Sequence, residues 1–338
     1  MKKEEKITFQ GSILPKFEDY SDFRRIFPDE QSCVDYLEAF MHKGKIPTSP
    51  FDPNSKVYEC ADKKVSTKKY SAKYKRYYCN TTRKYFNSRN NTIFENTKLP
   101  LLDWFHSFYF FANHKRGITS CQLAEDNGCD WRSAWFLTHR LRYIAGLHPT
   151  FKVKLKNEWE GDETALGGSD SNKHRDKKVP NSRGRNWKHK IIVFVMEQRG
   201  GYAIAEVVPN AKRDTLVPII RENAEEGSTA YTDEWPAYKS LRKWHKHLTV
   251  DHGKKQYTKQ YAGGKKASTN LVENYNSHLQ RMVYGNYFQI SKKYAQNYVN
   301  EFTFRRNTRK YSVQDRFNLL LSLAVGKRLT YKELTSQK

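Results

Sequence analysis

The second half of the chain alternates between strand-like and helix-like patterns, and this order most constrains the fold. It runs as three strands, a helix, two strands and a helix, at residues 152–160, 190–196, 202–208, 213–224, the segment around Asp233, 247–252 and 268–281. Short apolar runs rich in β-branched residues predict strands, and apolar residues at three- and four-residue steps predict helices. The order predicts an α/β domain with a mixed sheet flanked by helices.

Three acidic residues stand out within this pattern. Asp162 and Asp233 lie near the ends of strand-like runs, and Glu273 lies on the last helix, for which Thr269 or Asn270 can supply the N-cap. A single carboxylate on a helix is usually just solvated, but three from separate elements can hold two hard divalent ions such as Mg²⁺, with Mn²⁺ as a substitute. Two such ions can activate the attacking oxygen and stabilise the leaving oxygen when a phosphodiester is cleaved. Glu163 and Glu234 should point to the opposite strand faces.

The order of elements is that of a ribonuclease H-like domain. In that fold the first and fourth strands lie side by side, which would make Asp162 and Asp233 neighbours and turn Glu273 toward them. Asn270 and Asn274 are alternative third ligands. His252 follows a strand and is expected either to support DNA or metal contact or to be a structural histidine.

The formal net charge of +25 indicates a polyanionic partner, with DNA or RNA ahead of an anionic membrane surface. No run of about 18 apolar residues predicts a spanning helix, and no apolar signal segment follows the N-terminus, so we expect a cytoplasmic, nucleoid-associated protein. The cysteines are odd in number and lack framework spacing, which favours reduced thiols.

Four regions are expected along the chain. Residues 1–98 should form an N-terminal helix and a small β module, 99–148 a helix-turn-helix, 149–310 the α/β domain and 311–338 a basic tail. The Asn127-Gly128 turn between two helical patterns favours the helix-turn-helix, although plain helical hairpins share it. The β module has Cys60 and Cys79 but no paired Cys or His ligands, so zinc is not expected.

Basic side chains in two regions are candidates for DNA contact. The helix-turn-helix supplies some of them, and the basic loop between the first two strands of the α/β domain supplies others, because neutralised phosphates add salt-dependent affinity. With one more from the last helix, the candidates are Arg132, Arg140, Arg142, Lys177, Lys178, Arg183, Arg185 and Arg281.

Several motifs in order resemble the DDE transposases of bacterial insertion sequences, in the ISXO-like group related to Merlin elements. They are Asp-Glu-Thr-x-x-Gly-Gly at 162–168, Thr-Asp-x-x-x-x-Tyr at 232–238, Thr-Asn-x-x-Glu at 269–273, and the segments at 92–105, 285, 291–294, 301–305 and 307–309. The resemblance implies that Asp162, Asp233 and Glu273 are catalytic and hold Mg²⁺. It also implies double-stranded DNA, as element ends and target, and a homo-oligomer on that DNA.

The chain departs from the family pattern at three places. The zinc-ribbon positions are Ile46 to Ser49 and Cys79 to Thr82, which keep one of four ligands. Ser268 replaces a histidine, and Gln280 replaces a basic residue seven positions after the last acid. The leading interpretation is a DNA transposase that binds the ends of its element and catalyses metal-dependent strand cleavage and strand transfer. Two alternatives remain: a transposase-derived DNA-binding protein that no longer cuts, and a nuclease of the same fold without strand joining.

Overall fold

The computed structural model describes residues 6–9, 12–67, 69–167, 174, 175, 187, 190–251, 258–261, 264 and 266–336. The chain forms two compact units. The first unit comprises Met1–His114, Ile118–Ile144 and Lys310–Gln337, and the second comprises Lys115–Gly117 and Ala145–Arg309.

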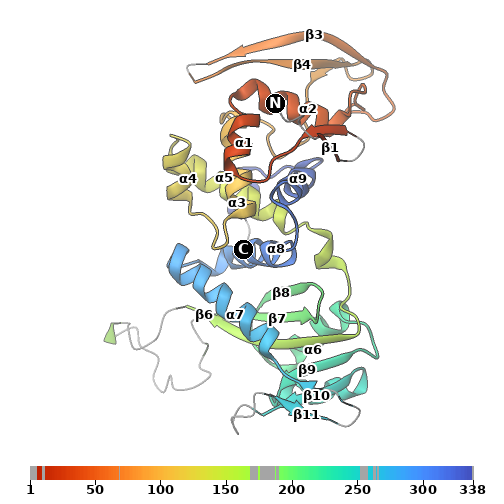
Figure 1. Ribbon diagram of the computed structural model, residues 1–338, viewed down its shortest axis with the longest axis vertical. Coiled ribbons are helices and arrows are strands. Elements are labelled where there is room, and N and C mark those ends of the chain that lie inside the picture. Colours follow the sequence, from red (N-terminus) through yellow and green to blue (C-terminus); the bar gives the residue numbers. More distant parts are fainter. Residues whose placement is uncertain are drawn as a thin grey trace. The chain divides into compact units, whose positions relative to one another are not determined.

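A five-stranded mixed sheet forms the second unit (Figure 1). Its strands are β6 (Glu158–Leu166), β7 (Ile191–Gln198), β8 (Ala203–Val208), β9 (Thr229–Asp233) and β10 (Lys246–Val250), in the order β10-β9-β6-β7-β8. The strand β6 pairs antiparallel with β7 and parallel with β9. The expected mixed sheet is confirmed, and its arrangement is compatible with a ribonuclease H-like domain.

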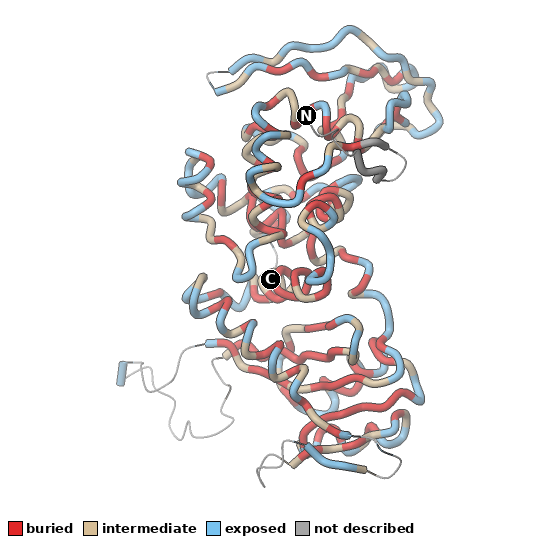
Figure 2. The backbone as a smooth tube through the Cα atoms, in the orientation of Figure 1, coloured by how far each residue is buried: buried red, intermediate tan, exposed pale blue. Residues whose placement is uncertain are grey.

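Helices cover both faces of this sheet, and Figure 2 shows its strands as largely buried. Successive side chains of a strand point to opposite faces, so β7 must be apolar on both sides. Phe194 and Met196 pack in one core, and Val193 and Val195 pack in the other. The covering elements are α6 (Arg213–Asn223) and the 3₁₀ segment η4 (Pro236–Lys243) on the first face, and α7 (Asn270–Met282) and α8 (Ala295–Asn307) on the second.

Short elements complete the second unit. They are the 3₁₀ segments η1 (Pro149–Lys152) and η7 (Lys292–Tyr294), the strands β11 (Lys259–Gln260) and β12 (Lys266–Ala267), and the π-helix η6 (Val283–Tyr287). The π-helix continues directly from α7, and its wider turn changes the direction of the side chains that follow.

The first unit is built around an aromatic core of rings from distant parts of the chain, in which Phe27 contacts Phe105 and Phe317. Its helices are α1 (Tyr20–Ile26), α2 (Glu30–His42), α3 (Leu101–Asn113), α4 (Ser120–Asp126), α5 (Trp131–Ala145), α9 (Val313–Ala324) and α10 (Tyr331–Ser336). Its strands are β1 (Lys6–Phe9), β2 (Ser12–Pro15), β3 (Val57–Ser66), β4 (Ser71–Cys79) and β5 (Lys84–Phe86).

Two regions of the first unit differ from, or refine, the expected organisation. The segment 311–338, expected as a basic tail, contains α9 and α10, and the Tyr36 hydroxyl donates to Asn318 Oδ1 at 2.7 Å. The expected helix-turn-helix region contains α4 and α5, and Thr119 caps α4 by accepting from Gln122 N. Its role in DNA binding stays a prediction. None of the described helices is both long and apolar enough to cross a bilayer.

Candidate functional site

The strand order places Asp162 and Asp233 on neighbouring strands. The parallel register of β6 and β9 pairs Trp159 with Ala230 and Glu160 with Tyr231. Asp162 and Asp233 each follow two residues after the second of these pairs. Glu273 lies in the first turn of α7, and α7 covers the face of the sheet to which the side chain of Asp162 points.

The three carboxylates are electrostatically coupled at Asp162. Burial raises the pKa of Asp162, and the negative charges of Glu163, Asp233 and Glu273 raise it further, to about 8. Like charges held together in a poorly solvated place favour the protonated acid unless a cation neutralises them. The site therefore favours binding of a positive charge.

Side chains of α7 fix the β6 side of the site. Asn276 Nδ2 donates to Asp162 Oδ2 at 3.0 Å. One helical turn further on, Gln280 Nε2 donates to Thr164 Oγ1 at 2.8 Å. The glutamine at this departure from the family pattern thus ties α7 to β6.

The other two acids are held locally. Trp235 N donates to Asp233 Oδ1 at 3.0 Å, which forms a turn directly after β9. Thr269 Oγ1 donates to Glu273 Oε1 at 2.8 Å. Thr269 stands at the N-cap position of α7 but makes no side-chain capping bond, because its hydroxyl serves Glu273 instead.

A buried acid that sequence reasoning missed caps α7. Glu160 Oε2 accepts from Leu271 N at 2.7 Å and from Val272 N at 3.4 Å. Glu160 Oε1 accepts from Arg199 Nε at 3.0 Å, and Arg199 Nη2 also donates to Ser268 Oγ at 3.0 Å. An available signal was the two-residue spacing from Glu160 to Asp162, which puts both on one strand face.

Glu163 and Glu234 occupy other surroundings, as expected. Glu163 is buried on the opposite face of β6, where it faces Tyr238 of the α6 core. Burial and the charge of Glu163 raise the pKa of the Tyr238 hydroxyl. Glu234 is exposed beside Asp233.

The alternative ligands differ in their availability. Asn270 is exposed at the start of α7. Asn274 Oδ1 accepts from Arg306 Nη1 at 2.9 Å, so this amide serves the packing of α8. His252 lies outside the described residues.

The donor set suits a hard divalent ion, because carboxylate oxygens are the ligands that Mg²⁺ prefers. In the described part of the chain, however, no group of three or more His, Cys, Asp and Glu side chains is positioned to hold a metal ion. Glu273 is engaged with Thr269 as placed. The chemistry of the three acids fits Mg²⁺, while their rotamers are not those of a closed ligand group.

Two of the candidate DNA contacts need correction. Arg140 and Arg142 are buried in the first unit, where Arg140 Nε donates to Leu329 O at 3.0 Å. The guanidinium of Arg140 also lies over the Phe136 ring at 4.1 Å. Since α5 needs a buried face, every third or fourth residue points inward, and these two arginines fall on that face. Arg132 and Arg281 are exposed, whereas Lys177, Lys178, Arg183 and Arg185 lie outside the described residues.

The residues at the zinc-ribbon positions do not fit zinc. Burial alone would raise the pKa of the Cys79 thiol, but hydrogen bonds with Ser49, Ser55 and Thr82 outweigh it and lower that pKa to about 6. Ile46 is exposed. Zinc prefers thiolate and imidazole ligands, and this site offers one thiol among hydroxyls.

Two comparisons bear on the family. Residues 154–307 match a family model described as an ISXO2-like transposase domain. An uncharacterised protein in transposable element ISH50 of Halobacterium salinarum is 23% identical over 172 residues, which are 50% of this chain and 58% of that relative. The match thus spans less than two thirds of the relative. Together the two matches confirm the resemblance to an insertion-sequence transposase.

Proposed function

From the ISXO2-like transposase domain matched at residues 154–307, we propose that this chain is a DNA transposase that binds the ends of its element and catalyses metal-dependent strand cleavage and strand transfer. The observation that carries the proposal is that burial, and then the negative charges of Glu163, Asp233 and Glu273, raise the pKa of Asp162 to about 8. The three acids come from β6, β9 and the first turn of α7.

Asp162, Asp233 and Glu273 are proposed to hold Mg²⁺, which when bound activates the attacking oxygen and stabilises the leaving oxygen of a phosphodiester. The chain's own contribution is to fix the acids. Asn276 orients Asp162, and the backbone N–H of Trp235 orients Asp233.

Glu160 contributes by fixing the start of α7 against β6, and so the position of Glu273 in the first turn. Catalytic groups held by rigid elements lose little freedom when substrate binds. The proposal therefore gives β6, β9 and α7 the role of a preorganised frame for the three acids.

The test uses purified full-length protein, Mg²⁺ or Mn²⁺, and labelled DNA containing the sequences that flank its gene. Wild type is compared with Asp233→Asn, and with Glu234→Gln as a matched control, because Glu234 is the exposed acid next to Asp233. We expect wild type and the control to cut and join at a defined end, and Asp233→Asn to lose at least about 10³-fold in rate while it still binds.

Binding by all three proteins with cleavage by none would reject the enzymatic proposal and favour a DNA-binding protein derived from a transposase. Cleavage without joining, and without preference for the flanking sequences, would indicate a nuclease of the same fold.

A further inference from the structure

The chain leaves α7 through an unusual turn. The helix that carries Glu273 passes into the π-helix Val283–Tyr287, and Phe288 follows with φ 56° and ψ −51°. Gln289 N donates to Tyr287 O at 2.5 Å, which closes a three-residue γ-turn around Phe288. Both π-helices and γ-turns with positive φ are rare, and π-helical turns are frequent at functional sites.

Two features of Phe288 are energetically unfavourable, namely its strained backbone and its exposed aromatic ring. Its side chain is 80% exposed, the highest value among the large hydrophobic residues described as exposed. Among the other described non-glycine residues with positive φ, all are polar, namely Lys43, Arg83, Asn91, Asn96 and Asn157. A strained backbone that presents a bulky apolar ring to solvent is a cost that packing does not explain, and it points to a bound partner.

A cavity of about 500 Å³ lies beside this ring. Phe288 and Tyr284 line it together with Lys190 and Lys292. The Tyr284 hydroxyl exchanges hydrogen bonds with Gly167, donating to its carbonyl at 3.1 Å and accepting from its N–H at 3.0 Å. One wall of the cavity is thereby fixed to the end of β6.

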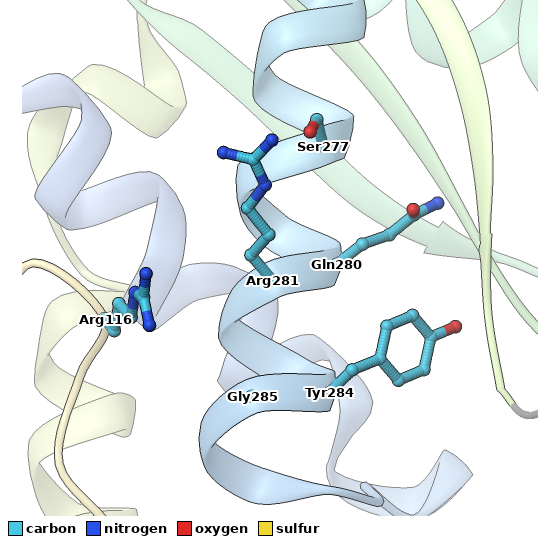
Figure 3. Close-up of a pocket in the computed structure, with 6 residues that line it drawn as sticks. All are labelled: Arg116, Ser277, Gln280, Arg281, Tyr284 and Gly285. Carbon is cyan, nitrogen blue, oxygen red and sulfur yellow. The ribbon is translucent and has the colours of Figure 1, made fainter.

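A second cavity, of about 450 Å³, adjoins the first through Tyr284. Figure 3 shows Arg116 on a separate segment, facing the turn of α7 that carries Arg281. Both arginines are exposed, and neither forms an ion pair with another described residue. Their guanidinium groups are available to a ligand with negative charge.

The segment that carries Arg116 is held to α7 and α8 by specific packing. Asn286 Nδ2 donates to Arg116 O at 3.3 Å. Gly117 has φ 83°, and a Cβ there would lie 2.6 Å from the Tyr287 hydroxyl oxygen and 2.7 Å from Glu301 Oε1. Only glycine fits, so the position of Arg116 is fixed by the fold.

The charge around both cavities identifies the kind of ligand. Among the described residues that line them, none is acidic, while Lys190, Lys292, Arg116 and Arg281 are basic. The sequence from 274 to 300 contains no Asp or Glu. Cations interleaved with aromatic rings match a nucleic-acid strand, whose phosphates need cations and whose bases stack on rings.

The site lies within a short length of DNA from the three acids. Gly167 follows Asp162 by five residues along β6, which is about 16 Å at the rise of an extended strand. In duplex DNA, successive phosphates of one strand advance about 3.4 Å along the helix axis, so this distance corresponds to about five nucleotides of duplex. A strand engaged at Asp162 can therefore reach Phe288.

Resting on the proposed function, we propose that Phe288 is a stacking platform for one unpaired nucleobase of the DNA strand engaged by the three acids. Lys190 and Lys292 neutralise the phosphates beside that base, and Arg116 and Arg281 hold the adjoining backbone. The strained γ-turn holds the ring in place before DNA binds, so little conformational entropy is lost when a base stacks on it.

The test measures stacking separately from cleavage. Full-length protein is irradiated with single-stranded oligothymidine, and with duplexes from its gene flanks, in which 5-iodouracil replaces one thymine at a time. We expect a crosslink to Phe288 in wild type and in Asp233→Asn. Phe288→Ala should bind the single strand about 10-fold more weakly, the size of one base–aromatic stack, while Phe288→Trp stays within about twofold of wild type.

Tyr202→Ala serves as the matched control, because Tyr202 is also exposed but precedes β8 at the opposite end of the sheet. Phe288→Gly checks folding, since glycine suits the γ-turn, and its thermal midpoint should equal or exceed that of wild type. A Phe288→Ala protein that binds the single strand like wild type, together with no crosslink to Phe288 in wild type, would overturn the proposal, as would a Phe288→Trp defect equal to that of Phe288→Ala.

The outcomes separate this proposal from the proposed function. A crosslink at Phe288 without cleavage of the gene flanks would support the stacking platform and reject the transposase. Cleavage with neither a crosslink nor a Phe288→Ala defect would support the transposase and reject the platform. A change of oligomeric state in Phe288→Ala with unchanged DNA affinity would assign the ring to a protein interface and reject the platform as well.

Discussion

At the scale of single residues, the site depends on two acids of the same strand, β6, that lie in different surroundings. Burial and then the like charges around it raise the pKa of Asp162, whereas Glu160 accepts hydrogen bonds from Arg199 and from the backbone of α7. Both lie on one face of β6, yet Asp162 has like charges around it and Glu160 secures the start of α7. Their partners, not their residue type, decide these roles.

Glu160→Ala should lower the free energy of unfolding by about 3 kcal/mol, because it removes a buried charged group and exposes the first amides of α7 to an empty space. Chemical denaturation measures the change. Glu158→Ala is the matched control: Glu158 also meets Arg199, at 3.5 Å, but its side chain is 35% exposed, and such pairs contribute below about 1 kcal/mol. Equal losses in the two variants would contradict the capping role.

At the scale of elements, polar side chains join segments that apolar packing alone would leave loosely aligned. Asn307, at the end of α8, donates to Ala203 O at 2.9 Å and accepts from Ala203 N at 2.8 Å, which fixes β8. The same amide donates to Thr150 Oγ1 at 3.0 Å, and Thr150 bonds to His148. The motif residue Asn307 thus has a structural reason for its position.

His148 should make the protein sensitive to acid. Burial lowers its pKa from 6.5 to about 4, so the unfolded chain binds a proton at pH values where the folded chain does not. The free energy of unfolding that depends on neutral His148 is fully present above pH 6.5. It is lost as pH falls toward 4, by up to about 1.4 kcal/mol per pH unit. His148→Asn keeps an acceptor but does not titrate, so its thermal midpoint should fall less between pH 7 and pH 5. If the thermal midpoints of wild type and His148→Asn fall equally between pH 7 and pH 5, His148 is not the source of the acid sensitivity.

Gly117 gives a second prediction at this scale. Gly117→Ala should lower the free energy of unfolding by about 2 kcal/mol, because the new Cβ meets the Tyr287 hydroxyl oxygen and Glu301 Oε1 and the backbone has positive φ. Gly200→Ala separates these causes, since its φ is 73° but nothing lies within 4 Å. Thermal unfolding should rank Gly117→Ala well below Gly200→Ala, and equal midpoints would show that the close approach is relieved.

At the scale of the whole molecule, charge governs the partner. The net charge of +25 is spread over both halves of the sequence, and part of it lies in the basic segment between β6 and β7. Each phosphate neutralised by a cation adds to the salt dependence of DNA binding.

Replacing Lys177, Lys178, Arg183 and Arg185 with glutamine should therefore reduce the slope of log affinity against log salt by up to about 4, with the loss shared by all DNA sequences. Fluorescence anisotropy at several salt concentrations measures the slope. An unchanged slope, with an unchanged thermal midpoint, would remove this segment from the DNA-contacting surface.

Much of the second unit could be read from local sequence patterns. The order of strands and helices predicts the mixed sheet, and the continuous apolar run of β7 is typical of a strand that is buried on both faces. The positions of Arg140 and Arg142 could not be read in this way. A basic helix pattern does not state which face its neighbours cover, and that depends on helices distant in the chain.

Residue type and spacing along the chain were enough to predict the order of strands and helices in the second unit and the resemblance to insertion-sequence transposases, and they marked Asp162, Asp233 and Glu273 as candidate site residues. Only the tertiary structure decided that Glu160 caps α7 and that Phe288 is held out in a strained turn. Those features arise from contacts between residues far apart in sequence and from backbone angles, which local patterns do not encode.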